Sequence, residues 1–552
     1  MIDRIREGIS WLLSGESGPR GYLYARWLFL RALAFVYLSA FYSLAFQIKG
    51  LIGPQGILPA GRYLQAVSQY YPDIMRFWLA PSVLWIRSGN RSLELLVWVG
   101  LIASVLLLVN VWPRLTLAIC FIAFVSFVSV ARDFSGYQSD GMLLEAGFMS
   151  LFFAPPGLWP GLGRANPPAR ATLYLLRWEW FRIYFESGVV KLASGDQSWR
   201  HLTAMYDYYQ NGPLPTWIGW YVQQFPHWFH QGSVVITFGA ELVIVWLVFL
   251  PRRFKIICFW LVTPFEISII LTANYAFLNY IVLFLGILLL DDEYLQKFIP
   301  ARFRAPVPGA TPADAPPATP RHNNFAAEWR ERTRGVRKSI KGIACGWVFY
   351  ATTALLIATV FHDFPLPEAP VRWVEPFRIA EQYGLFANMT HERYEIEFQG
   401  SRDGKTWTPY PFGHKPQDIY KAPGIYAPYQ PRFDWNLWFA SLGSWREYPW
   451  TVVVEESLLR NDRPVLQLFA GNPFGEQPPQ MVRAVLWQYW FTDRAQKRAT
   501  GAWWRREMRG LYCPALVMQP NGQIGADDSP RVQPSGTPPA GNEPPGELQP
   551  QQ

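Results

Sequence analysis

Nine long stretches with few charges divide this 552-residue chain, and they constrain its fold more than any other feature. A helix that crosses a bilayer needs about 20 consecutive apolar residues, because the hydrocarbon core is about 30 Å thick. Most of the stretches approach that length, so the sequence predicts a polytopic α-helical membrane bundle. The shortest stretch, residues 142–154, is expected to be re-entrant or extended at its N-terminal side. The nine stretches cover residues 27–48, 93–112, 114–131, 142–154, 172–192, 233–250, 256–273, 275–290 and 343–361.

The distribution of charge supports a membrane protein. Charged residues make up only 16% of the chain, and the net charge of +9 comes from basic residues beside the apolar stretches. That placement is typical of membrane topology and not of a nucleic-acid-binding face. If the basic turn 252–255 and the basic linker 297–341 are cytoplasmic, the N-terminus is inside, and the 193–232 loop and the C-terminal domain are outside. The 49–92 loop conflicts with this orientation, because it would be external and yet carries five basic residues.

The same features divide the chain into six regions. Residues 305–320 are rich in Pro and Ala and cannot form a core, and the C-terminal tail is rich in Pro, Gly and Gln. We predict a cytoplasmic N-terminal segment (1–26), a helix bundle (27–290), a basic Pro/Ala-rich cytoplasmic linker (291–342), a last membrane helix (343–361), an extracytoplasmic β-rich domain (371–518) and a disordered tail (519–552).

The C-terminal domain is predicted to be mainly β and sandwich-like. Residues 394–398 alternate apolar and polar side chains, which indicates a half-buried strand. Asp403 and Gly404 predict a hairpin turn into a second strand over 407–412. Residues 451–455 fit either a strand or a helix start. We also expect a late strand over 481–491 and a helix around 435–442.

One apolar helix, residues 174–192, carries charges that need an explanation. Glu179, Arg182 and Glu186 lie on one face, so Arg182 can reach both carboxylates. Charges inside a membrane helix are costly unless they pair or face a water-filled cavity. The face is either the lining of a functional cavity or an ion-pair network that fixes the position of the helix.

Other polar residues near this helix have two interpretations each. Lys191 could be a desolvated base or a substrate clamp, or it could extend to the interface. Asp140 and Glu145 could face the same cavity, or Asp140 could cap a helix. His201 could relay protons or be structural. If the protein is an enzyme, the catalytic candidates are Asp140, Glu145, Glu179, Arg182, Glu186, Lys191 and His201.

Metal, cofactor and redox chemistry have no sequence signature here. The four cysteines are isolated, and three of them lie inside apolar stretches. No zinc-binding spacing, nucleotide-binding loop or serine-hydrolase motif is present. We therefore expect no metal and no cofactor.

Several motifs, in order along the chain, resemble those of the lipase maturation factor family. Residues 187–196 read SGVVKLASGD and are followed by Trp199 and Arg200. The similarity covers most of residues 20–515. This chain departs from the family pattern at Tyr208 and Gln210, where a His and an acid often stand. Further family-like segments are 53–59 (GPQGILP), 138–140 (QSD), 144–148 (LEAGF), 213–215 (PLP), 383–390 (YGLFANMT) and 431–435 (PRFDW).

The resemblance implies a membrane protein that assists the folding and assembly of exported lipases, in the endoplasmic reticulum of eukaryotes or the inner membrane of a bacterium. The membrane half more distantly resembles vitamin K-dependent carboxylases. The implied partners are an exported client, such as a lipase or other hydrolase, and membrane lipid, but no nucleic acid. Client-binding candidates are Trp199, Arg200, Trp435 and Trp438, although the last two could be core residues. The alternative is a membrane-embedded enzyme that acts on a lipid, a quinone or an exported polypeptide in a polar cavity.

Overall fold

The computed structural model describes residues 2–15, 20–300, 324–361 and 366–526, and it divides into two compact units. The helical unit comprises Met1–His391 and Ala422–Asn436, and the sheet unit comprises Glu392–Lys421 and Leu437–Gln552. Residues 301–323 of the predicted linker and most of the predicted tail lie outside the described residues.

Six helices in the described part of the helical unit are long and apolar enough to cross a membrane. They confirm the prediction of a multi-pass helical membrane protein. They are α2 (Leu23–Ile52), α5 (Asn90–Leu108), α6 with η2 (Pro113–Ser135), α12 with η3 and η4 (His227–Phe249), α13 (Arg252–Thr272) and the Gly335–Phe361 part of α16 (Asn324–Phe361).

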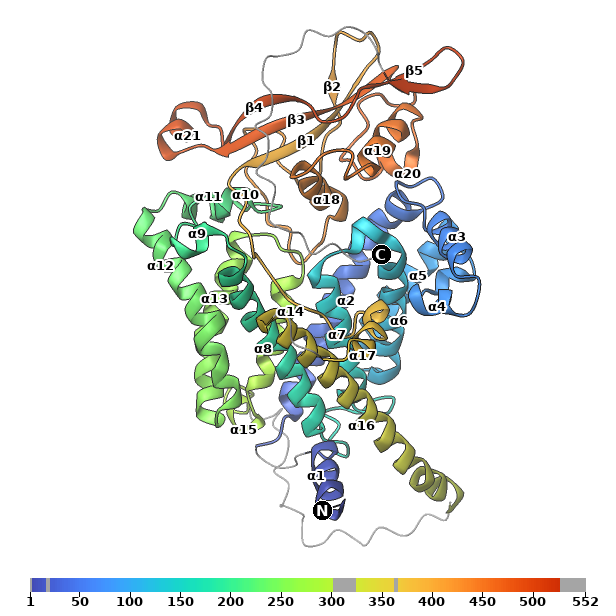
Figure 1. The fold of residues 1–552 in the computed structure, drawn as a ribbon, viewed down its shortest axis with the longest axis vertical. Helices are drawn as coiled ribbons and strands as arrows, with labels where there is room; N and C mark the ends of the chain where they lie inside the picture. The colour runs from blue at the N-terminus through green and yellow to red at the C-terminus, as the bar shows by residue number, and fades with distance from the viewer. Residues whose placement is uncertain (1, 16–19, 301–323, 362–365, 527–552) are drawn as a thin grey trace. The chain divides into compact units, whose positions relative to one another are not determined.

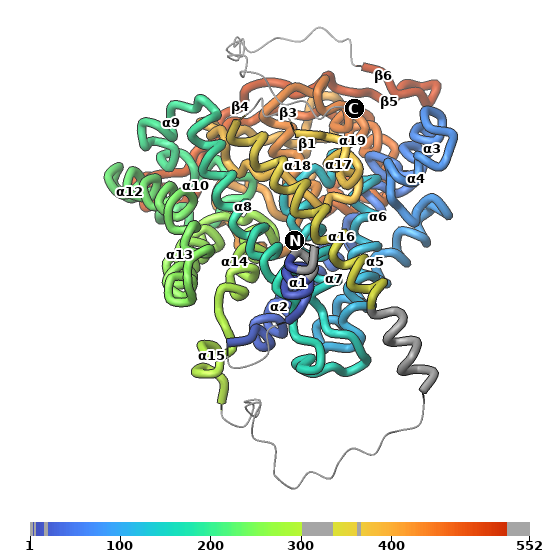
Figure 2. The backbone as a smooth tube through the Cα atoms, turned by 60° about the horizontal axis from the view of Figure 1, so that its bottom comes forward, coloured from blue at the N-terminus to red at the C-terminus, as the bar shows by residue number. Residues whose placement is uncertain are grey.

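Three predicted apolar stretches form helices that do not meet these criteria. Helix α7 (Gln138–Phe153) has 16 residues, a length of about 24 Å, and is shorter than the hydrocarbon core. Helix α8 (Arg170–Ala193) is long enough but carries several charges. Helix α14 (Leu278–Gly286) continues into the short η5 (Ile287–Leu289). Helix α8 packs against α7, α14 and α16, so its charged face is inside the bundle (Figures 1 and 2).

Short helices connect these elements. Their bounds are α1 (Ile2–Leu13), α3 (Ala60–Tyr70), α4 (Met75–Leu79), η1 (Val83–Trp85), α9 (Gln197–Arg200), α10 (Tyr208–Asn211), α11 (Trp217–Gln223), α15 (Asp292–Leu295), α17 (Ala369–Arg372) and η7 (Glu375–Phe377).

The sheet unit contains one six-stranded sheet. The strand order is β2-β1-β3-β5-β6, and β4 also pairs with β3. The long antiparallel pair of β1 and β3 aligns Ile396 with Leu486, and the predicted strands at 394–398 and 481–491 are thereby confirmed. The predicted second strand is only two residues long. The strands are β1 (Arg393–Ser401), β2 (Thr408–Pro409), β3 (Met481–Phe491), β4 (Trp504–Leu511), β5 (Leu516–Met518) and β6 (Ile524–Ala526).

Two details of the predicted domain differ from the structure. The described strands form a single sheet and not a sandwich of two sheets. Residues 451–455, predicted as a strand or a helix start, lie in helix α19, which packs on β3. Strand β1 is buried on both faces, because its polar side chains are paired: Lys415 binds Glu395 at 2.8 Å. The helices here are α18 (Arg432–Ser441, which begins in the helical unit), α19 (Trp450–Leu459), α20 (Arg463–Leu466) and α21 (Arg494–Thr500).

Candidate functional site

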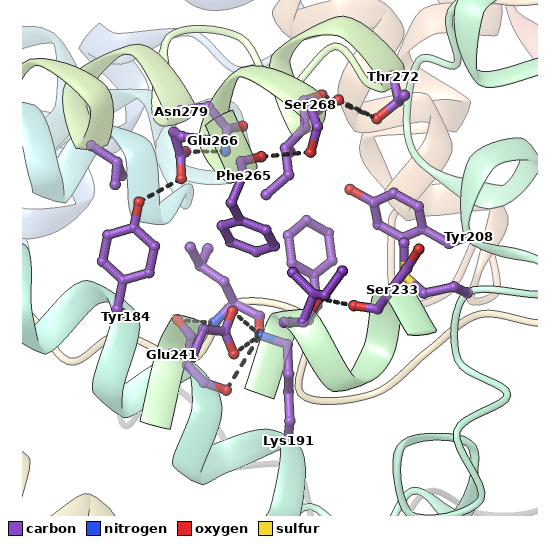
Figure 3. A pocket seen from close by; sticks show the side chains of 18 of the residues that line it. Tyr184, Lys191, Tyr208, Ser233, Glu241, Phe265, Glu266, Ser268, Thr272 and Asn279 are labelled. Carbon is purple, nitrogen blue, oxygen red and sulfur yellow. Dashed lines mark hydrogen bonds and ion pairs between the residues drawn. The ribbon is translucent and has the colours of Figure 1, made fainter. Parts of the chain in front are cut away.

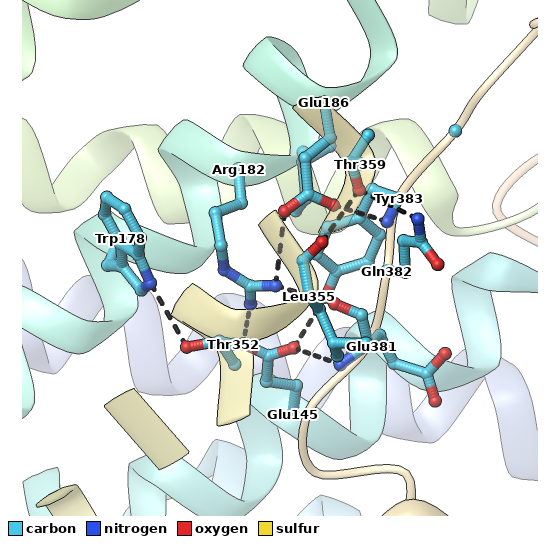
Figure 4. Close-up of polar contacts among 12 residues, drawn as sticks. Glu145, Trp178, Arg182, Glu186, Thr352, Leu355, Thr359, Glu381, Gln382 and Tyr383 are labelled. Carbon is cyan, nitrogen blue, oxygen red and sulfur yellow. Dashed lines mark hydrogen bonds and ion pairs between the residues drawn. The ribbon is translucent and has the colours of Figure 1, made fainter. Parts of the chain in front are cut away.

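Arg182 is the centre of a buried polar network in the helical unit. Its side chain is fully buried and binds the carboxylate of Glu145 on α7. Its Nη1 donates a 2.7 Å hydrogen bond to the backbone carbonyl of Glu381 and lies 3.8 Å from Oε1 of Glu186 (Figure 4). The predicted pair of Arg182 with Glu186 is therefore present, and the guanidinium also joins α8 to α7 and to the segment after η7.

That segment contributes backbone donors to the same network. The backbone N–H of Tyr383 donates to Glu186 at 2.6 Å, and the Tyr383 hydroxyl donates to Glu145 at 3.0 Å. The backbone N–H of Glu381 also donates to Glu145, at 3.1 Å. A Cβ atom at Gly141 on α7 would lie 2.5 Å from the Glu381 carboxyl carbon, so the missing side chain at Gly141 gives the Glu381 side chain room at this position. Hydrogen bonds thus offset the desolvation cost of burying the carboxylates of Glu145 and Glu186.

Glu179 is not part of this pairing. The i, i+3 spacing predicts contact with Arg182, but no ion pair between them is formed among the described residues, since Arg182 extends to Glu145 instead. Glu179 is fully buried, and within the described chain neither carboxylate oxygen meets a donor with hydrogen-bond geometry. The backbone N–H of Ala146 supplies a weaker favourable interaction. Glu179 is therefore the member of the predicted trio whose burial cost is least compensated.

A second buried pair lies near the start of α7. Arg432 donates to both oxygens of Asp140 at 2.7 and 2.8 Å, and both side chains are fully buried. Arg432 also donates to the carbonyl of Phe134 at 2.7 Å. The bidentate partner of Arg432 is 292 residues away in the chain, so local sequence does not reveal this pair.

Lys191 takes part in a third group of contacts. Its ammonium is buried and donates to both carboxylate oxygens of Glu241, at 2.8 and 2.9 Å, and to the carbonyl of Leu385 at 3.0 Å. It therefore does not extend to the interface. A Cβ at Gly188 would lie 2.6 Å from Leu242, so this glycine allows α8 to approach η3 closely enough for the pair.

Glu266 on α13 is also buried and hydrogen-bonded. The Tyr184 hydroxyl and the Asn279 amide each donate to it at 2.6 Å (Figure 3). Glu241 and Glu266 thus both pack inward against polar partners.

These two carboxylates line a cavity of about 470 Å³. Pro264 lies inside the continuous helix α13, within one turn of Glu266, and Glu241 lies in a π-helical turn, η3 (Gly239–Val243). Irregular turns of this kind are common at functional sites. The remaining lining is mostly apolar and comes from α8, α9, α10, α11, α12, α13, α14, Met205 and residues 385–386.

The predicted site residues do not share one cavity. Lys191 and Trp199 line the 470 Å³ cavity, whereas Asp140, Glu145, Glu179, Arg182 and Glu186 do not. Arg200 and His201 are exposed at the end of α9. Trp199, Trp435 and Trp438 are buried, so these three side chains do not form an exposed client-binding surface.

The 193–232 loop is held by Asp196. This residue caps α9 by accepting hydrogen bonds from the N–H and hydroxyl of Ser198, at 2.8 and 2.6 Å. It also accepts one from the N–H of Met389 at 2.7 Å. Burial opposes ionisation of Asp196, but these hydrogen bonds outweigh it and lower the pKa of the carboxyl.

The residues that complete these networks are not evident from the sequence pattern; they are Tyr383, Glu381, Tyr184 and Asn279. Only the family-like segment 383–390 gave a signal for the first of them. In the described chain, no group of three or more His, Cys, Asp or Glu side chains could hold a metal ion, and all four cysteines are free and buried.

These features define a class: a multi-pass helical membrane protein with buried ion pairs and a separate C-terminal sheet unit. Residues 24–297 match the lipase maturation factor transmembrane domain, and residues 379–514 match the lipase maturation factor C-terminal domain. The chain belongs to the lipase maturation factor family.

Relatives from vertebrates align over almost the whole chain. Lipase maturation factor 1 of Bos taurus is 31% identical, over 94% of this chain and 91% of the relative. Lipase maturation factor 2 of Gallus gallus is 31% identical, over 89% and 81%, and that of Homo sapiens is 32% identical, over 89% and 82%. No solved structure matches the chain significantly.

Proposed function

We propose that this protein is a membrane-bound maturation factor for an exported lipase. The observation that carries the proposal is the presence of both family domains, in order, on one chain. The relatives that align over most of their length are named for lipase maturation.

The chemistry of the buried network favours a scaffold over an enzyme. Six of the seven catalytic candidates lie away from the cavity, and four of these six are held by ion pairs or by hydrogen bonds to backbone groups. Such groups position helices and segments and have no access to a substrate. The alternative is an enzyme that acts on a lipid in the cavity beside Lys191. Turnover of a lipid by the purified protein in membranes would support this alternative.

The proposal includes an orientation. The 193–232 loop and the sheet unit lie on the extracytoplasmic side, where an exported client folds. The membrane is the endoplasmic reticulum in a eukaryotic cell and the inner membrane in a bacterium. The basic 252–255 turn supports this orientation, because basic loops are retained in the cytoplasm.

Photo-crosslinking in cells that export a lipase tests both parts. A crosslinking amino acid at Arg200 or at Tyr420, which is 61% exposed, is expected to trap the lipase during its export. The same group at Lys297, exposed within the predicted cytoplasmic linker, is the control and is expected to trap none. If no position traps the lipase, and its specific activity is the same without this protein, the proposal is wrong.

A further inference from the structure

The 470 Å³ cavity opens toward the lipid-facing surface of two candidate spans. Ile236 on α12 is 62% exposed and Leu261 on α13 is 51% exposed, and both line the cavity. Pro264 and Ser268, also exposed, continue the same edge. Because the surface of α12 and α13 meets hydrocarbon in a membrane, a lipid chain can enter the cavity from the side.

The hydroxyl groups of the lining are acceptors. Thr237, Ser268 and Thr272 each donate their hydroxyl hydrogen to a carbonyl of their own helix, at 2.9, 2.6 and 2.7 Å. A hydroxyl oxygen that has donated its hydrogen can still accept. A ligand that satisfies these oxygens must therefore supply donors of its own.

The charges of the lining disfavour an anion. The three hydrogens of the Lys191 ammonium are directed to Glu241, to the Leu385 carbonyl and, at 3.4 Å, to the Ser187 carbonyl. The lining thus contains one cation that is already paired and two carboxylates, Glu241 and Glu266. An anionic ligand in this site would be repelled by the carboxylates and would lack a free counter-ion.

We propose that the cavity binds the hydrocarbon chain of an uncharged lipid whose head group carries hydroxyl groups, the chemistry of a monoacylglycerol. The apolar lining holds the chain, and the carboxylate and hydroxyl oxygens accept from the head group (Figure 3). The volume of about 470 Å³ is within the range of small-molecule sites, about 300–1,000 Å³. The proposal is independent of the role in lipase maturation.

Photolabelling of the full-length protein in nanodiscs tests it. One probe is a monoacylglycerol with a diazirine in its acyl chain, and the matched probe is the fatty acid with the same chain, which is anionic. The neutral probe is expected to label peptides within residues 227–282, and an excess of unlabelled monoacylglycerol is expected to abolish that labelling. Equal labelling by both probes, or labelling that resists competition, would overturn the proposal.

Two substitutions at the opening give a steric test. Ile236→Trp and Leu261→Trp place a larger ring at the lipid-facing edge, and each is expected to reduce labelling by the neutral probe about tenfold. Val243→Trp is the matched control, because Val243 is 67% exposed on the same span and does not line the cavity. Labelling unaffected by the first two variants would contradict binding in this cavity.

A charge substitution tests the selectivity. Glu241→Gln removes the carboxylate that pairs with Lys191, so the ammonium becomes available to an anion. This variant is expected to gain labelling by the fatty acid probe while the steric variants lose labelling by the neutral one. A fatty acid signal that does not rise in Glu241→Gln would show that the Lys191–Glu241 pair does not control selectivity.

Discussion

Arg432 and Asp140 form a bidentate ion pair between residues 292 positions apart, and both side chains are fully buried. The pair holds the start of α7 against the start of α18, and the Phe134 carbonyl occupies a further donor of Arg432. A buried pair of this geometry costs little when intact, but losing one partner leaves an uncompensated charge.

We therefore expect Arg432→Gln to lower the free energy of unfolding by about 3–5 kcal/mol, because Asp140 would remain buried without its cation. Denaturant titration of the protein in detergent micelles measures this change. The matched control is Arg372→Gln, which breaks the exposed pair with Glu368 and is expected to cost less than about 1 kcal/mol. The double variant Arg432→Gln, Asp140→Asn is expected to recover part of the loss, and an additive effect of the two substitutions would contradict direct coupling.

Glu179 is expected to behave in the opposite way. Because its carboxylate is fully buried and has no hydrogen-bond donor with good geometry in the described chain, Glu179→Gln or Glu179→Leu is expected to leave stability unchanged or raise it by about 1–2 kcal/mol. Glu186→Gln, four residues from Arg182 on the same helix, is the comparison and is expected to destabilise. Thermal unfolding in the same detergent measures both. A large loss of stability in Glu179→Leu would mean that Glu179 has a partner after all.

The segments that span and the strands that pair were predictable, because both depend on local pattern. A lipid-length apolar run identifies a membrane helix wherever it occurs, and the alternation in 394–398 identified β1 without knowledge of its neighbours. The same reasoning failed where tertiary packing decides. The polar face of β1 is expected to be exposed from the pattern alone, but Lys415 enters from another part of the chain and pairs with it.

The partners of the charged helix could not be predicted for the same reason. Helical spacing gives the residues that share a face, and it correctly placed Arg182 near Glu186. It does not give the residues of α7, or of the segment around Tyr383, that compete for the same guanidinium. Arg182 therefore pairs with Glu145, and Glu179 forms no ion pair with Arg182 in the described chain.

The stability of the folded protein is expected to depend on pH through Asp196. The lowered pKa of its carboxyl means that the ionised form stabilises the folded loop; this contribution is complete above the unfolded pKa of about 3.9 and is lost as pH falls through the lower folded value. Asp196→Asn removes the charge, so the difference in melting temperature between wild type and Asp196→Asn is expected to be constant from pH 7 to about 5 and to shrink below pH 4. Asp73→Asn, on the exposed turn before α4, is the control. A difference that grows on acidification would contradict the predicted sign.

The cysteines are expected to be inert in the folded protein. All four are buried and free, and burial beside Glu455 raises the pKa of the Cys513 thiol, so the reactive thiolate of Cys513 is scarce at neutral pH. Maleimide at pH 7.5 is therefore expected to label the native protein negligibly and the denatured protein at all four positions, which mass spectrometry of the peptides measures. Tyr420→Cys supplies an exposed thiol in the same unit as Cys513 and is expected to react within minutes under the same conditions. Rapid native labelling of Cys513 would show that the sheet unit opens around α19, and it would restore a redox role that a buried thiol argues against.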